Sequence, residues 1–202
     1  MASDALKDFV SGYSIEVVPN SAAKVESFAE TLPANTRVYI AHLSEKEDIK
    51  TMVATAKRIN AEGFSVMPHI PARIIKDKNM LTEWLSMYQN EANVSEALLL
   101  AGGSSQPLGE FDSSMQLIET GEFDKLGFKR LHVAGHPEGS KDIDPDGGKK
   151  NTSSALSWKQ EFSKRTDAKM AIATQFCFDA NTVISWAENL KKDGIDIPIH
   201  IG

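Results

Sequence analysis

The sequence predicts an α/β fold built as a (β/α)8 barrel, with this chain covering about seven βα units and lacking the last strand and helix. The first observation is a series of short apolar runs, which are expected strands. They are Tyr13–Val18, Arg37–His42, Phe64–Ile70, Ala97–Gly102, Arg130–Gly135, Met170–Phe176 and Pro198–Gly202. The second is that helix-like segments alternate with these runs, a pattern that calls for a parallel sheet.

Apolar residues at helical spacing mark the expected helices. They are Glu45–Ala61, Asp77–Gln89, Asp112–Thr120, Ser153–Thr166 and Asn181–Lys192. Glycines close to the ends of three of them, Gly63, Gly121 and Gly194, are typical helix stops.

Loop length is the third observation. The segments 102–110 and 135–150, which follow expected strands, are longer than 61–63 and 194–197, which precede them. In a barrel the longer loops carry the functional site. Periodicity alone leaves a doubly wound open sheet as the alternative. No Gly-x-Gly-x-x-Gly follows the first run, so a nicotinamide-binding Rossmann fold is not expected.

Composition indicates one soluble globular domain over residues 13–202, preceded by an extension over residues 1–12. The chain has 202 residues, of which 41% are hydrophobic, enough for one sizeable core. A net charge of −6 argues against a nucleic-acid partner, and no apolar run is long enough to span a membrane. Cys177 is the only cysteine, which excludes an intramolecular disulfide and fits a cytoplasmic protein; we interpret it as a small core residue.

Glu16 interrupts the first apolar run. A carboxyl group in apolar surroundings has a raised pKa and can serve as a general acid, which is the functional interpretation. The structural alternative is that Glu16 pairs with a buried cation or caps a helix. Both remain open from the residues alone.

Histidines lie near several strand ends. His69 ends the third run, where a hydrogen-bonding role is the simpler interpretation, and His42 reads as a surface residue. His132 faces the side of its strand opposite to Val133, and His200 is not interpreted. They lie on different strands without carboxylates at helical spacing, so no metal site is expected. The turn Gly102–Ser105 could let backbone N–H groups approach a ring or phosphate, or could be an ordinary tight turn.

Four segments together resemble the methylenetetrahydrofolate reductase family. They are Ser14-Ile-Glu-Val-Val-Pro19, Met67-Pro-His69, Val133-Ala-Gly-His-Pro-Glu138 and Ala173-Thr-Gln-Phe-Cys-Phe-Asp179. They occur in the order and at roughly the spacing of that family, and the resemblance covers about Tyr13 to Gly202. It implies a (β/α)8 barrel that binds FAD, takes hydride from NADH or NADPH, and reduces 5,10-methylenetetrahydrofolate to 5-methyltetrahydrofolate. The family belongs to one-carbon metabolism and methionine biosynthesis.

The resemblance also implies roles for single positions. Glu16 matches the catalytic acid that protonates a folate nitrogen and opens the ring to an iminium, and Glu16, Gln175 and Phe176 match substrate-binding positions. The positions that match flavin contacts are His69, Leu100, Gly102, Gly103, Ser113, Ala134, Gly135, His136, Ser140 and Arg165. Arg165 falls where the family has a lysine near the flavin phosphates. Folate and NAD(P)H are the expected partners, together with a possible second copy of the chain.

Departures from the family pattern keep alternatives open. The family's Arg-Gly-Asp after strand four is here Ala101-Gly102-Gly103, so its aspartate is missing. His136 replaces a tyrosine, and Ser140 stands where histidine is common. The alternatives are a flavin-independent reductase of the same family, a non-catalytic relative that binds folate or flavin, and an unrelated barrel enzyme acting on a phosphorylated metabolite at Gly102–Ser105.

Overall fold

The structure, a computed structural model, describes residues 4–202 and contains a single seven-stranded parallel sheet. Its strands are β1 (Ser14–Val17), β2 (Arg37–Ile40), β3 (Ser65–Pro71), β4 (Glu96–Leu100), β5 (Arg130–Gly135), β6 (Lys169–Thr174) and β7 (Ile199–His200). Each strand pairs with the next one along the chain. This order has no reversal, so the doubly wound alternative is excluded.

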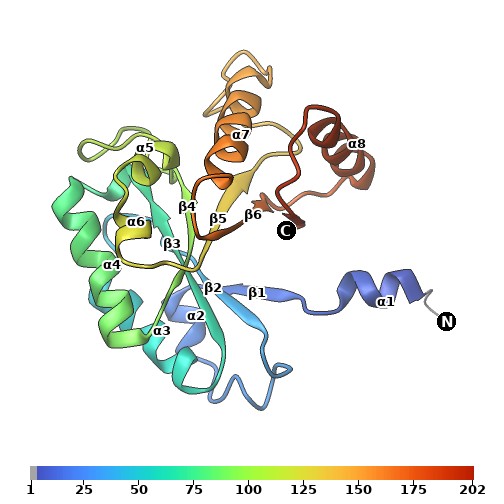
Figure 1. Ribbon diagram of the computed structural model, residues 1–202. Coiled ribbons are helices and arrows are strands. Elements are labelled where there is room, and N and C mark those ends of the chain that lie inside the picture. The colour runs from blue at the N-terminus through green and yellow to red at the C-terminus, as the bar shows by residue number, and fades with distance from the viewer. Residues whose placement is uncertain (1–3) are drawn as a thin grey trace.

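Helices cover the outside of the curled sheet, which gives a TIM-barrel-like architecture (Figure 1). The helical elements of the chain are α1 (Asp4–Val10), α2 (Pro19–Ala22), α3 (Ile49–Ala61), the 3-10 turn η1 (Ala72–Ile74), α4 (Lys78–Ala92), α5 (Ser114–Glu119), α6 (Glu122–Lys125), α7 (Lys150–Ser163) and α8 (Ala180–Lys192). Helix α1 has no buried residue and projects away from the sheet. Within residues 4–202, no helix is both long and apolar enough to cross a membrane.

The structure confirms the expected alternation of strands and helices, while helix starts shift by a few residues. Helix α3 begins at Ile49, later than predicted, because the Asp48 side chain accepts a hydrogen bond from the Lys50 N–H (3.3 Å) and caps the helix there. Helix α7 begins earlier than predicted. The Asp144 carboxylate accepts from the N–H groups of Asn151 (2.8 Å) and Thr152 (3.0 Å), which fixes its first turn.

Two apolar clusters hold the fold together, one on each face of the sheet. The larger lies between the sheet and its helices and contains outward strand residues such as Val38, Leu99 and Ile172. The smaller faces the lumen of the curled sheet and consists of Tyr39, Met67 and Leu98, with Leu100 and Ala173 packed against it. Because side chains alternate along each strand, the lumen receives every second residue.

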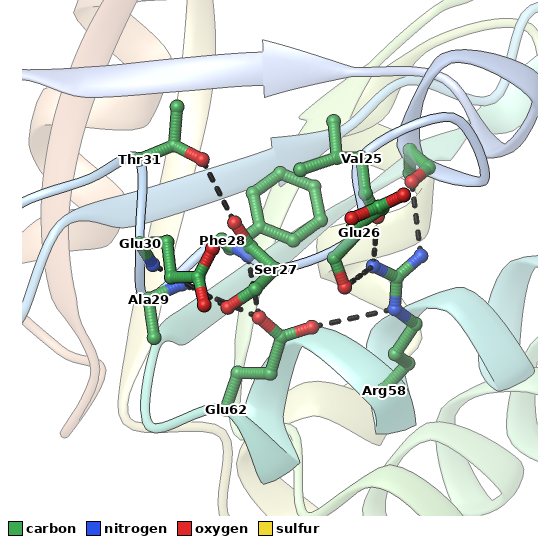
Figure 2. Close-up of polar contacts among 10 residues, drawn as sticks. Val25, Glu26, Ser27, Phe28, Ala29, Glu30, Thr31, Arg58 and Glu62 are labelled. Atoms are coloured by element: carbon green, nitrogen blue, oxygen red, sulfur yellow. Dashed lines mark hydrogen bonds and ion pairs between the residues drawn. The ribbon is translucent and has the colours of Figure 1, made fainter.

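An ion pair at the C-terminal end of α3 fastens the segment that connects α2 to β2 (Figure 2). The Arg58 guanidinium donates to the backbone carbonyls of Ala22 (3.0 Å), Val25 and Glu26 (3.3 Å). Glu62 accepts from the backbone N–H groups of Phe28 (2.6 Å) and Ala29 (3.3 Å), and lies 3.3 Å from Arg58. This segment enters β2 at its N-terminal end, so the contact contributes stability and lies away from the C-terminal edge.

We expect Glu62→Gln to destabilise the protein by roughly 1–3 kcal/mol, because both N–H groups lose a charged acceptor and Arg58 loses its partner. Urea denaturation followed by circular dichroism measures the change. Glu91→Gln, at an exposed carboxylate on α4, is the control and should lie within about 0.5 kcal/mol of the unmodified protein. Equal denaturation midpoints for the two variants would contradict the role given to Glu62.

Candidate functional site

Five polar side chains from five strands form a connected group on the lumen side of the sheet. They are Glu16 (β1), Tyr39 (β2), His69 (β3), His132 (β5) and His200 (β7). We call this set the lumen group. A buried face of a parallel sheet is normally apolar, so a continuous polar group there indicates a site.

Glu16 and His69 lie in direct contact near the C-terminal ends of β1 and β3, and we call them the Glu16–His69 pair. The His69 Nε2 lies 3.1 Å from Glu16 Oε2, but off the line of a straight hydrogen bond. The Glu16 side chain is 58% exposed, whereas the His69 side chain is 10% exposed. The pair therefore offers a carboxylate that a ligand can reach, backed by a buried imidazole.

The surroundings of Glu16 correct the expectation from the sequence. We expected an apolar strand to raise its pKa, but the contact with His69 lowers the pKa of Glu16 below its usual value, and partial burial opposes this only in part. Glu16 is therefore ionised in the free protein. Of the two structural alternatives, a buried cation and a helix cap, the contact with the buried imidazole of His69 is nearer to the first.

Tyr39 crosses the lumen to reach His132. Its Oη lies 2.6 Å from His132 Nδ1, although β2 and β5 are not neighbours in the sheet. The Tyr39 ring also meets the His69 ring edge-on at 6.3 Å, so it connects both halves of the lumen group. The His132 ring lies 4.9 Å from that of His200.

Two arginines and one glutamate lie at the N-terminal end of the same strands. Glu96 Oε2 is 2.8 Å from Arg37 Nε, and its Oε1 is 3.4 Å from Arg130 Nε. The register places these side chains on the lumen face of β2, β4 and β5, two residues before Tyr39, Leu98 and His132. Two guanidinium groups share one carboxylate, which leaves a net positive charge beneath the lumen group.

The long loops at the C-terminal edge are fastened by Arg73, which lies in η1 directly after β3. Its guanidinium is within 2.8 Å of both Asp112 Oδ1 and Asp142 Oδ2, and donates to the Ser104 carbonyl at 3.1 Å. The loops after β3, β4 and β5 are thereby joined. The Arg73 side chain is only 11% exposed, and its role here is to order the rim of the site.

Several predicted residues do lie at this edge. Leu100 packs in the lumen cluster, and Ala134 faces the lumen two residues after His132. Gly102 has φ +97°, a conformation that favours glycine, and a Cβ there would lie 3.0 Å from Pro71 Cβ. Gly103 has nothing within 4 Å of its Cβ position, so its backbone is open to a ligand.

Gln175 and Phe176 follow β6 on the same edge. Gln175 is exposed, and its N–H donates to the Gly135 carbonyl at 2.8 Å. Phe176 is 65% exposed and Phe178 is 88% exposed, with their ring centroids 4.9 Å apart. Cys177 lies between them and is partly exposed, so its interpretation as a core residue is wrong.

Other predicted residues lie away from the lumen group. Gly135 faces outward, where a Cβ would lie 2.5 Å from Ile172 Cγ2 and 3.0 Å from the Trp186 ring. Arg165 follows α7 at the opposite end of the sheet, with its guanidinium over the rings of Trp158 (5.8 Å) and Phe162 (5.2 Å). The structure therefore does not bring Arg165 together with the residues at the C-terminal edge.

The remaining predicted positions are in the loops or at the strand end. Ser113 precedes α5, and its N–H donates to Gln116 Oε1 at 3.0 Å. His136 follows β5 and is partly buried; burial, and then Lys159, lower its pKa. The Ser140 carbonyl accepts hydrogen bonds from Ile143 and Asp144. His42, expected at the surface, is 3% exposed and stacks on Trp84 at 5.2 Å, so that expectation is wrong.

Sequence reasoning missed Tyr39, His132 and His200. One signal was available for the first two. Because side chains alternate along a strand, Tyr39 shares a face of its strand with Arg37, and His132 shares a face of its strand with Arg130. Two polar side chains on the same face are unusual in buried parallel strands.

Comparison with known proteins supports the fold and leaves the family open. No family model matches the chain. A solved GH10 endoxylanase retrieved from a sugarcane soil metagenome is similar, with a TM-score of 0.51 and 10% identity over 96% of this chain and 68% of that chain. At this identity the likeness concerns the TIM-barrel-like fold alone.

Proposed function

We propose that this chain is a reductase of the methylenetetrahydrofolate reductase type, which converts 5,10-methylenetetrahydrofolate to 5-methyltetrahydrofolate with NADH or NADPH. The proposal includes a closed (β/α)8 barrel, to which β1–β7 contribute seven strands. The observation that carries it is the Glu16–His69 pair near the C-terminal ends of β1 and β3. This is the sheet edge at which barrel enzymes hold their substrates.

The reaction needs one proton and one hydride. A proton placed on the folate nitrogen breaks its bond to the methylene carbon, which leaves an iminium at that carbon; hydride then adds to the carbon and gives the methyl group. The Glu16–His69 pair carries the proton when His69 is protonated and Glu16 is ionised. Folate binding covers the exposed carboxylate, and Glu16 passes the proton from the imidazole to the nitrogen.

Gln175 and Phe176 are the proposed folate contacts. Both are exposed at the edge where Glu16 is reached, so an amide and an aromatic face are available to a flat pterin ring. The exposed Phe176–Phe178 pair is unusual for a protein surface, and a ligand that stacks there would remove apolar area from water.

FAD is part of the proposal, and the residues fit its ring better than its phosphates. The open backbone at Gly103 and the small side chain of Ala134 could hold a planar ring at the lumen mouth, with His136 directly after β5 as a further expected contact. Bound there, FAD would relay hydride from NAD(P)H to folate. The cation assigned to the phosphates, Arg165, lies at the other end of the sheet. That placement favours the second candidate, a flavin-independent reductase of the same type.

A visible spectrum of the purified protein, followed by an assay with NADH, NADPH and methylenetetrahydrofolate, tests the proposal. Flavin bands together with 5-methyltetrahydrofolate support the flavoenzyme, whereas product from a colourless protein supports the flavin-independent one. Bound flavin or folate without turnover indicates a non-catalytic binding protein. If the protein forms no product and binds neither flavin nor folate, the proposal is rejected. The alternative to test would then be a barrel enzyme that acts on a phosphorylated metabolite at Gly102–Ser105.

A further inference from the structure

His132 carries a buried ring nitrogen that has no hydrogen-bond partner among the described residues. Its side chain is 0% exposed, Nδ1 is 2.6 Å from Tyr39 Oη, and Nε2 has no hydrogen-bond partner within residues 4–202. An unpaired buried polar group costs roughly 1–3 kcal/mol, so it calls for an explanation. The proposed reaction uses neither His132 nor His200.

The hydrogen-bond pattern indicates which nitrogen carries the proton. Burial raises the pKa of Tyr39 to about 12, so the phenol keeps its proton. Burial, and then the charges of His200, Arg37 and Arg130, lower the pKa of His132 to about 3, so its ring is neutral. If Tyr39 donates to Nδ1, only the Nε2–H of His132 lacks a partner. The reverse direction would leave both the phenol hydrogen and Nε2 unpaired, so we assign the proton to Nε2.

The charges at the base of the lumen, beneath this N–H, are positive on balance, because Arg37 on β2 and Arg130 on β5 share the single carboxylate of Glu96 on β4. Glu16 on β1 lies at the exposed mouth of the lumen, 3.1 Å from His69 on β3. His200 on β7 adds a second imidazole with its ring 4.9 Å from that of His132. A buried donor beside a second imidazole, above an excess of guanidinium charge, suits an anionic acceptor.

We propose that His132 and His200 form a binding subsite for a small carboxylate anion, held by the Nε2–H of His132 and the imidazole of His200. Tyr39 is a positioning residue of this subsite, because its hydrogen bond to Nδ1 sets the tautomer of His132. The inference rests on the lumen geometry and is independent of the proposed reductase activity.

Formate, the smallest carboxylate, is the probe. In an NMR titration of protein labelled with ¹⁵N-histidine at neutral pH, formate should shift the His132 and His200 ring signals saturably. His42 is an internal control, since it is also buried with an unpaired Nδ1 but stacks on Trp84 outside the lumen. Its signal should stay in place, whereas equal shifts of His42 and His132 would show a general salt effect and overturn the proposal.

The His132→Asn variant provides a second experiment. The oxygen of the asparagine side chain can replace Nδ1 as the acceptor for Tyr39, while the Nε2–H is lost. Formate should raise the melting temperature of the unmodified protein and not that of the variant. Equal stabilisation of both proteins would reject the subsite. If the variant does not fold, the NMR titration of the unmodified protein still tests the proposal, because an unshifted His132 signal rejects it. Both experiments are done without folate or nicotinamide, so failure of the reductase proposal would not affect their outcome.

Discussion

Glu16→Gln should reduce the rate of methylenetetrahydrofolate reduction by about 100-fold or more, because general acid catalysis typically contributes 10²–10⁴-fold. The amide keeps the size of the carboxyl group and cannot pass on a proton. Where the protein carries flavin, reduction of that flavin by NADH should stay within about twofold, since this half-reaction needs no proton at the folate nitrogen. Stopped-flow absorbance measures the two half-reactions separately.

Glu110→Gln is the matched control for this prediction. Glu110 is also an exposed carboxylate at the C-terminal end of the sheet, and it contributes only its backbone N–H, to the Lys76 carbonyl at 2.9 Å. Both half-reactions should be unchanged in this variant. If Glu16→Gln instead slows both half-reactions equally, the residue supports the site through its pairing with His69 and is not the acid.

The alternation of strands and helices was predictable because it depends on local patterns. An apolar run bounded by polar turns marks a buried strand, and all seven expected strands are present in the expected order. Helix starts were harder to predict, because they depend on which acidic side chain acts as the cap. Asp144 caps α7 from a loop position six residues before the helix begins, which helical periodicity does not report.

The environment of Glu16 could not be derived from its own strand. Its apolar neighbours Ile15 and Val17 pack on the outer face, while Glu16 points to the lumen and is largely exposed at its mouth. Its pKa is set by His69, which lies two strands away in the sheet and more than 50 residues away in sequence. A contact across the lumen depends on how far the sheet curls, and sequence periodicity carries no information on that.

The contact between Tyr39 and His132 could not be predicted from the sequence either. Alternation places each of them on the lumen face, but their 2.6 Å contact exists only because the sheet curves enough to bring β2 opposite β5. Arg165 shows the same limit for the resemblance. Its match to a family lysine implied a phosphate contact, whereas the structure places it after α7 at the N-terminal end of the sheet, against the rings of Trp158 and Phe162.

Ala134 and Gly135 allow the face assignment to be tested with adjacent substitutions in β5. Ala134→Leu should fill the lumen mouth and empty the ligand site while the melting temperature changes little. Gly135→Ala should leave the ligand site intact and cost about 1–3 kcal/mol, because its Cβ would lie 2.5 Å from Ile172 Cγ2 and 3.0 Å from the Trp186 ring. Flavin absorbance per chain and a melting curve are measured for both variants, with folate fluorescence quenching in place of absorbance if the protein is colourless.

The two variants should therefore show opposite results, although their positions are one residue apart. Each controls for the other, since they share a strand and differ in the face that the new atoms occupy. Full ligand occupancy in Ala134→Leu would remove the end of β5 from the proposed site. Unchanged stability in Gly135→Ala would mean that Trp186 on α8 does not pack against this strand as described. Ligand loss with a normal melting temperature in Ala134→Leu alone would support a ligand that sits over the lumen face of β5, between Gly103 and the lumen group.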